Sequence, residues 1–132
     1  MINFTVYGTP KGKGRPRMTK TGHVYTPQQT IDYEEKVRIA WKKSAKGRKM
    51  TGALSVEILV FFETPKNWSM KKKTEMMGKF AEKKPDIDNV AKIILDALNK
   101  LAYHDDSQVV AISCQKMWGT ESKVHVSVET IG

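Results

Sequence analysis

The stretch PDIDNVAKIILDALNKLAYHDDS, residues 85–107, contains the clearest structural pattern of the chain. Its apolar positions recur at intervals of three and four residues, which predicts one amphipathic α-helix from Asp86 to about Leu101. Pro85 and Asp86 are typical of a helix start, because the first N–H groups of a helix lack intrahelical partners and an aspartate caps them. Burying the apolar stripe of this helix requires a second layer, so we expect it to pack against a sheet.

The same stretch holds most of the aspartates of the chain. Five of the six lie within 21 residues: Asp86, Asp88, Asp96, Asp105 and Asp106. At helical spacing Asp88, Lys92 and Asp96 share the face opposite the apolar stripe. Taken singly, these residues are typical of a solvated surface with two i,i+4 ion pairs, a cap and a turn. Taken together, the carboxylates at the two ends of the helix predict a cation site only if the chain folds back and brings them together.

The charge of the chain is unevenly distributed. The sequence has 23 lysines and arginines against 14 acidic residues, a formal net charge of +9. The first 27 residues contain no acid and five bases: Lys11, Lys13, Arg15, Arg17 and Lys20. A cation-rich surface favours a polyanion through counterion release, whereas clustered carboxylates repel phosphate unless a divalent metal compensates. This combination favours metal-assisted phosphodiester hydrolysis, in which Lys92 stabilises developing negative charge or, alternatively, only forms a salt bridge.

The remaining elements predict one domain over residues 1–132. Alternating or continuous apolar runs predict strands over residues 2–7, 54–62, 109–117 and 123–130. Residues 28–46 predict a helix, residues 8–27 a Gly- and Pro-rich loop, and residues 64–84 a loop with a short helix from Ser69 to about Gly78. The run 54–62 is apolar on both sets of alternating positions, which predicts a central strand covered on two faces.

Together these elements predict an α+β domain with a mixed sheet packed against two or three helices. A lone cysteine, Cys114, excludes a disulfide framework and four-cysteine zinc sites. It favours a reducing compartment, and the absence of a signal-peptide pattern favours the cytoplasm.

Two motifs resemble the RusA family of Holliday junction resolvases, which is common in prophages. One is KPDIDNVAKIILDALNKLAYHDDSQV, residues 84–109; the other is GTPKGKGRPRM, residues 8–18, followed by YTP, as in Gram-positive relatives. The resemblance implies a homodimeric, Mg²⁺-dependent endonuclease, with Mn²⁺ as an alternative cation. Such an enzyme nicks two opposed strands of a four-way DNA junction in recombination and repair, and a two-fold dimer matches the symmetry of that substrate.

The resemblance also implies roles for individual residues. Asp86, Asp88 and Asp106 are the implied metal ligands and Lys92 the catalytic lysine, with Asp105 assisting. The turn LAYHDD is one residue shorter than in the family pattern, so Asp105 and Asp106 both remain candidates for the third ligand, and Asp106 is favoured. The basic loop with Lys11, Lys13, Arg15, Arg17 and Lys20 is expected to contact the DNA backbone.

Two other functions use the same residues. In a non-enzymatic phage regulatory or packaging protein, the basic loop binds nucleic acid, and the aspartates only cap the helix and form the turn after it. In a nuclease for flaps or duplexes, the same chemistry acts on another substrate. Trp68 is either a base-stacking residue beside lysines or part of the core, and His104 is either a ligand or base beside the acidic pair or a solvated turn residue.

Overall fold

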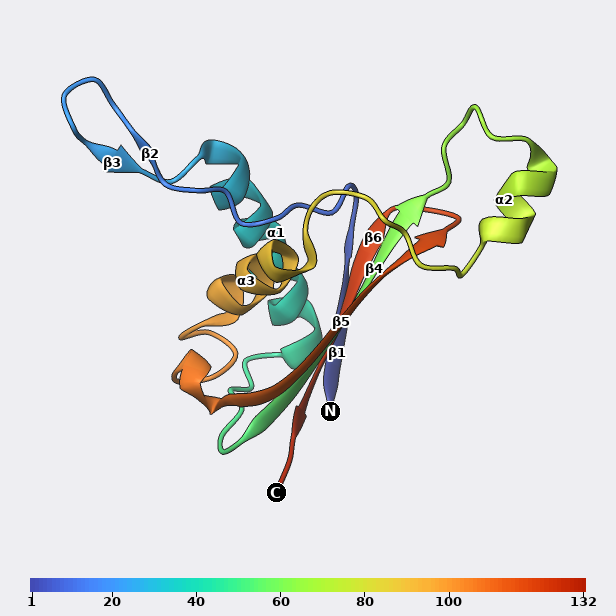
Figure 1. The fold of residues 1–132 in the computed structure, drawn as a ribbon. Helices are drawn as coiled ribbons and strands as arrows, with labels where there is room; N and C mark the ends of the chain where they lie inside the picture. Colours follow the sequence, from blue (N-terminus) through green and yellow to red (C-terminus); the bar gives the residue numbers. More distant parts are fainter.

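The computed structural model describes all 132 residues, and its centre is a four-stranded sheet with two helices on one face (Figure 1). The strands are β1 (Ile2–Tyr7), β4 (Leu54–Glu63), β5 (Val109–Gly119) and β6 (Lys123–Thr130). Their order in the sheet is β1-β6-β4-β5, and β4 pairs parallel to β5 and antiparallel to β6. The predicted α+β class with a mixed sheet is therefore confirmed, and β4 is an inner strand as expected.

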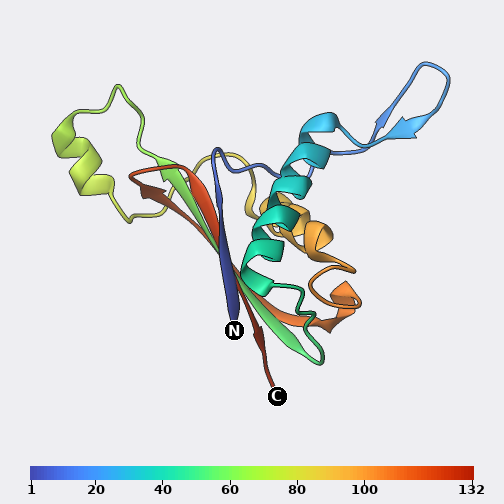
Figure 2. The same cartoon turned by 180° about the vertical axis from the view of Figure 1, so that it is seen from behind.

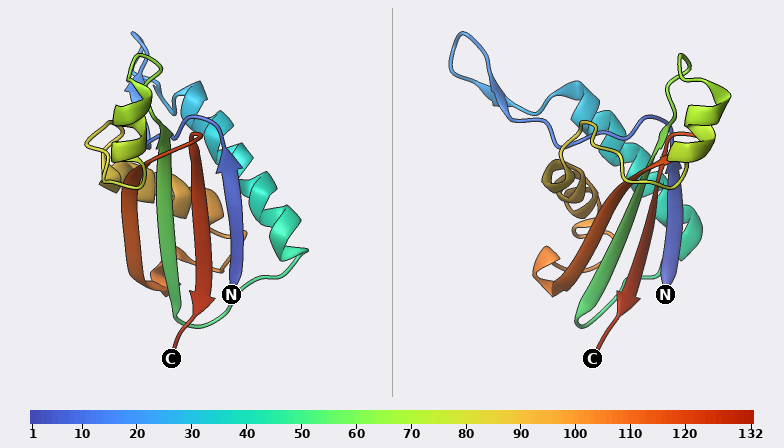
Figure 3. Two further views of the ribbon diagram at one scale, coloured as in Figure 1. Left: turned by 90° about the vertical axis from the view of Figure 1, so that its right-hand side faces the viewer. Right: turned by 45° about the vertical axis from the view of Figure 1, so that its right-hand side comes forward.

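Two helices cover one face of this sheet and form the core with it. α1 (Gln28–Ala45) lies behind β1 and α3 (Ile87–Leu98) lies behind β5, as the face-on view shows (Figure 3). Buried side chains follow the predicted helical stripes, for example Val37 and Trp41 on α1 and Val90 and Ile94 on α3. Full burial of one such side chain contributes about 1.5–3 kcal/mol, so this stripe fixes the position of α3 on the sheet.

The prediction that β4 is covered on both faces is wrong. Burial alternates along the strand: Leu54, Val56 and Ile58 are fully buried under the helices, whereas Leu59 and Phe61 on the other face are only half-buried. Both long helices lie on one side of the sheet, and no further layer covers its other face (Figure 3). The apolar pattern of β4 therefore reflects its inner position rather than a second helical layer.

Residues 64–84 form an arm beyond the end of the sheet opposite the chain termini (Figure 1). The arm contains α2 (Met70–Met76), whose first turn is capped by Ser69 through a hydrogen bond from the Lys72 N–H at 3.2 Å. Where the arm leaves the sheet, the Trp68 ring packs against the Trp118 ring, with 5.0 Å between the ring centres. The Lys72 ammonium lies over the Trp68 ring. Trp68 is thus a packed residue, the second of its two predicted roles.

The basic loop is more ordered than the sequence indicates. It contains a hairpin of two short strands, β2 (Arg17–Met18) and β3 (Val24–Tyr25), where a continuous loop was expected. The hairpin projects from the start of α1, on the side of the molecule away from α2 (Figure 2). None of the helices combines the length and the apolar composition that crossing a lipid bilayer requires.

Candidate active site

The N-terminal end of α3 presents two carboxylates that the helix itself does not use. Asp86 occupies the N-cap position, but its side chain makes no capping hydrogen bond and instead pairs with Lys84, with 2.7 Å between Nζ and Oδ1. Asp88 lies in the first turn, is exposed, and has no hydrogen-bond or ion-pair partner. A helix N-terminus stabilises negative charge, and neither carboxylate caps the backbone of the helix, so both remain available to a ligand.

Cationic groups surround this carboxylate pair. Lys116 reaches across from β5 and donates hydrogen bonds to the carbonyl oxygens of Lys83 and Pro85, at 2.8 and 3.2 Å. The hydrogen bond from Lys84 lowers the pKa of Asp86, and the charges of Lys84 and Lys116 lower it further. No sequence spacing pointed to Lys116, because its place follows only from the position of β5 at the edge of the sheet.

The basic loop is fixed to the same end of α3. The Lys13 N–H donates to the Asn89 carbonyl at 2.9 Å, and the Gly14 N–H donates to Thr30 Oγ1 at 3.1 Å. A Cβ on Gly12 would lie 2.9 Å from Cβ atoms of both Pro85 and Asn89, so only glycine allows this approach. The loop glycines therefore place the cationic segment against the helix end that carries Asp86 and Asp88.

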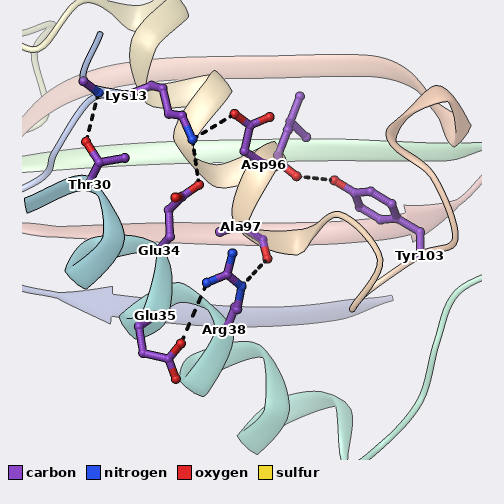
Figure 4. Close-up of polar contacts among 10 residues, drawn as sticks. Lys13, Thr30, Glu34, Glu35, Arg38, Asp96, Ala97 and Tyr103 are labelled. Carbon is purple, nitrogen blue, oxygen red and sulfur yellow. Dashed lines mark hydrogen bonds and ion pairs between the residues drawn. The ribbon is translucent and has the colours of Figure 1, made fainter. Parts of the chain in front are cut away.

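One predicted DNA-binding residue has a different environment. Lys13 Nζ forms ion pairs with Glu34 on α1 and Asp96 on α3, at 3.1 and 3.2 Å (Figure 4). Partial burial works against the ammonium, but hydrogen bonds to the two carboxylates outweigh it and raise the pKa of Lys13. In the structure, Lys13 therefore links the basic loop to both α1 and α3.

Lys92 is exposed and unpaired, one turn after Asp88. The two i,i+4 ion pairs that the sequence allowed among Asp88, Lys92 and Asp96 are not formed: Asp96 binds Lys13 instead, and Asp88 has no ion-pair partner. The ammonium of Lys92 is consequently available on the same helix face as Asp88. The other four predicted DNA-binding cations are also exposed: Lys11, Arg15, Arg17 and Lys20.

The second acidic pair lies beyond the other end of α3, in a tightly bonded turn. α3 ends at Leu98, three residues earlier than predicted, and the Tyr103 hydroxyl donates to the Leu95 carbonyl at 2.9 Å (Figure 4). Asp105 caps the single 3₁₀ turn Asp106–Gln108 by accepting from the Ser107 N–H at 3.1 Å. That bond and the ion pair with Lys100 lower the pKa of Asp105 to about 2.

Asp106 differs from its neighbour. It is exposed and makes no hydrogen bond or ion pair through its carboxylate, whereas the carboxylate of Asp105 is already used as a cap. His104 is exposed and uses its backbone N–H to bind the Gln108 side chain at 2.8 Å. The turn therefore offers one free carboxylate, that of Asp106.

The expected convergence of the four carboxylates does not occur within one chain. α3 has 12 residues, so its two ends are separated by about 18 Å. The turn after α3 runs on to the start of β5 and away from the helix start (Figure 1). No group of three or more histidine, cysteine, aspartate or glutamate side chains lies close enough to share a metal ion. One chain thus presents two separate acidic sites: Asp86 with Asp88, and Asp106.

Comparison with known proteins identifies the family. A family model described as Endodeoxyribonuclease RusA matches residues 7–129, which include the basic loop, α3 and the acidic turn. The chain belongs to the RusA family. Among curated relatives, the uncharacterized protein YqaN of Bacillus subtilis (strain 168) is 36% identical over 137 residues, covering 98% of this chain and 96% of that protein. Membership in RusA confirms the resemblance found in the two motifs and assigns the chain to a family of endodeoxyribonucleases.

Proposed function

We propose that this RusA protein is a homodimeric, Mg²⁺-dependent endonuclease that resolves four-way DNA junctions by paired symmetric nicks, in recombination and repair. The observation that carries the proposal is the N-terminal end of α3, where the exposed carboxylates of Asp86 and Asp88 and the unpaired ammonium of Lys92 share basic surroundings. A protein that only bound DNA would gain nothing from unpaired carboxylates facing phosphate. The setting proposed is a prophage or its host.

The donor groups at this helix end suit Mg²⁺. This cation prefers oxygen ligands and is usually held by one or two carboxylates, several waters and a substrate phosphate. Asp88 has no competing partner, and Asp86 is engaged only by the exposed side chain of Lys84. When bound, Mg²⁺ or Mn²⁺ polarises the scissile phosphate and makes a water more acidic.

The residues of the chain supply the remaining functions. Lys92 lies one turn beyond Asp88 and is placed to stabilise the negative charge that develops on the phosphate or the leaving oxygen. The exposed cations of the basic loop hold the sugar-phosphate backbone against this helix end, independent of base sequence. Lys13 keeps the loop in place through Glu34 and Asp96.

A second subunit explains how Asp106 joins the site. The outer edge of β5 is unpaired from Val110 to Gln115, whereas residues 78–81 cover its last part through hydrogen bonds to Lys116 and Trp118. Val110 and Ile112 on this free edge are 63% and 46% exposed. A long apolar edge strand is a template for pairing with another chain, so we place the dimer interface at this edge.

Two-fold symmetry makes such a pairing antiparallel. The start of β5, which follows Asp106, then lies beside the end of β5 in the partner, where Lys116 binds the Pro85 carbonyl next to Asp86. Asp106 thereby approaches the acidic pair at the start of α3 in the partner subunit. Each of two symmetric sites would contain Asp86, Asp88 and Lys92 from one chain and Asp106 from the other.

The direct test of the function compares a four-way junction, a flap and a linear duplex, each with and without Mg²⁺, by strand-resolved product analysis. Paired nicks placed symmetrically in the junction, and only with the cation, are the expected result. Preferred cutting of the flap or duplex would identify a nuclease of different specificity, and binding without cutting would identify a non-enzymatic binder.

The shared site has a separate test by complementation. Asp88→Asn and Asp106→Asn are each expected to be strongly impaired alone, because every site of either homodimer lacks a ligand. A mixture of the two forms heterodimers in which one site has lost both groups and the other has kept both. Mixing should therefore restore nicking of one strand, and no restoration would mean that Asp106 does not act across the interface.

A further inference from the structure

Phe80 is the most exposed aromatic side chain of the protein, at 72% of its possible surface. It lies in the 64–84 arm, next to Lys79 and shortly before Lys83 and Lys84. We propose that Phe80 is a base-stacking residue, whose ring packs on a nucleobase that leaves the base stack at the branch point of the DNA substrate. The inference rests on the proposed function and deepens it, since it names a contact that distinguishes branched DNA from duplex.

The exposed ring stands on a rigid backbone. The Gly78 N–H donates to the Trp118 carbonyl at 2.9 Å, the Trp118 N–H to the Lys79 carbonyl at 3.0 Å, and the Ala81 N–H to the Lys116 carbonyl at 2.9 Å. These bonds pair the segment antiparallel with the end of β5, so that Phe80 lies opposite Met117. A large apolar side chain that is exposed on a fixed backbone is presented to a ligand at little entropic cost.

The other aromatic residue of the arm, Trp68, already packs against side chains of the protein. Trp68 packs on Trp118 and is covered by the Lys72 ammonium at 4.4 Å from its ring centre. The ring of Phe80 has no aromatic partner and no cation over it. Of the two, Phe80 is the one whose ring is largely exposed and free to contact a base.

The charge of the arm indicates what the ring contacts. The arm has seven lysines and only two glutamates, so a phosphate backbone is attracted to it, whereas a basic protein surface is repelled. Sequence-tolerant binding of unpaired bases combines such a cationic surface with an aromatic platform. The same combination argues against Phe80 as a contact between two copies of this strongly basic chain.

The position of Phe80 relative to the acidic pair also fits a single DNA substrate. Phe80 precedes Asp86 by six residues, which span at most about 20 Å when fully extended. Stacked nucleotides rise by about 3.4 Å, so both residues lie within reach of about six nucleotides of one strand. Lys116 ties the two together, since its carbonyl binds Ala81 and its ammonium binds the carbonyls of Lys83 and Pro85.

The test uses a junction with 2-aminopurine at the branch point, in Ca²⁺ so that binding is measured without dependence on cleavage. Wild-type protein should raise the fluorescence, because the base leaves its neighbours for the ring of Phe80. Phe80→Ala should abolish this rise and weaken junction binding by roughly 5- to 150-fold, the loss of one stacking contact. Affinity for linear duplex should not change.

Two variants serve as controls. Phe80→Trp should retain junction affinity, since indole also stacks on bases, and Met70→Ala removes an equally exposed side chain from the same arm and should have no effect. Sedimentation of Phe80→Ala should show an unchanged dimer.

The outcomes separate this inference from the proposed function. Equal losses on junction and duplex, no loss on either, or a weakened dimer in Phe80→Ala would each overturn base stacking, even if the wild type resolves junctions. Conversely, a Phe80-dependent fluorescence rise in a protein that does not cut junctions in Mg²⁺ would support stacking and reject the nuclease function. A wild-type protein that produces no fluorescence rise overturns stacking directly.

Discussion

Aspartates lie at both ends of α3, but they make different contacts at the two ends. At the start of the helix, Asp86 and Asp88 are free of capping bonds and stand among cations contributed by β5 and the loop before the helix. Beyond its end, Asp105 is consumed by a capping box and an ion pair, and only Asp106 is free. The difference shows which aspartates stabilise the fold and which are available for chemistry, a distinction that residue type alone does not make.

The comparison also shows what one chain lacks. The helix that separates the ends is about 18 Å long, so the free carboxylates form two separate acidic sites. β5 connects them. It starts shortly after Asp106, and near its end Lys116 donates a hydrogen bond to the carbonyl oxygen of Pro85, next to Asp86. Pairing this strand with its copy is the simplest way to join the two sites.

The largest effect is expected at the start of α3. Asp88→Asn removes a proposed ligand that has no structural partner, so cleavage in Mg²⁺ should fall by about 10³-fold or more. Affinity for the junction should be retained or increased, because the change removes a negative charge facing phosphate. A gel assay of nicking with binding measured in parallel tests this, and loss of binding by a folded variant would contradict the assignment. Asp86→Asn should behave in the same way.

The next largest effect separates the two aspartates of the turn. Asp106→Asn should reduce cleavage by about 10²-fold with little change in the thermal midpoint, since its carboxylate bonds to nothing in the chain. Asp105→Ala removes the cap of the 3₁₀ turn, and should lower the thermal midpoint while cleavage is largely kept. Calorimetry and nicking rates on both variants decide the matter, and the reverse pattern would make Asp105 the ligand.

The fold and the acidic residues were largely predictable from the sequence because both depend on local patterns. The stripe of α3 and the alternation in β1 and β6 reflect burial on one side, which the apolar spacing records directly. The extent of α3 was less predictable: Tyr103 bonds back to Leu95 and the chain turns at Asn99, a tertiary contact that the apolar repeat through Leu101 does not show.

The environment of each charged residue was not predictable, because it depends on which segments meet. The spacing of Asp88, Lys92 and Asp96 favoured ion pairs along the helix, yet Lys13 from a distant loop takes Asp96. Similarly, the exposed aromatic residue of the arm is Phe80 rather than Trp68, because Trp68 packs on Trp118 at the end of the sheet and Phe80 does not. Sequence spacing identified the acidic residues but not their partners.

A third prediction concerns the strand that joins the two ends. Ile112→Lys places like charges at the proposed two-fold axis, and should weaken the dimer by about 10- to 100-fold, which sedimentation measures. Stability of the monomer should change little because Ile112 is already 46% exposed. Ile39→Lys on α1, where the isoleucine is equally exposed, is the matched control and should leave the dimer intact. A dimer that survives Ile112→Lys would place the interface elsewhere.

A fourth prediction divides the basic loop into two functions. Arg15→Ala with Arg17→Ala should reduce the slope of log affinity against log salt by about 2, one phosphate contact for each arginine. Lys13→Met should instead leave Glu34 without its partner and cost about 1–3 kcal/mol of unfolding free energy. Titrations at several salt concentrations and urea unfolding distinguish the two, and a flattened slope in Lys13→Met would show that this lysine also contacts phosphate.

The smallest effect concerns the chemical reactivity of the one cysteine on β5. Burial raises the pKa of Cys114 to about 11, although nearby Lys116 opposes the shift. Because only the thiolate is alkylated, about one molecule in 1,000 is reactive at pH 8, and the rate should rise about tenfold for each pH unit up to pH 11. Since Cys114 lies on the edge proposed for the dimer, wild-type protein diluted until it is monomeric should be alkylated faster than the concentrated dimer at the same pH. Equal rates at the two concentrations would mean that nothing covers this edge in the dimer, and the two ends of α3 would then have to be joined by another surface.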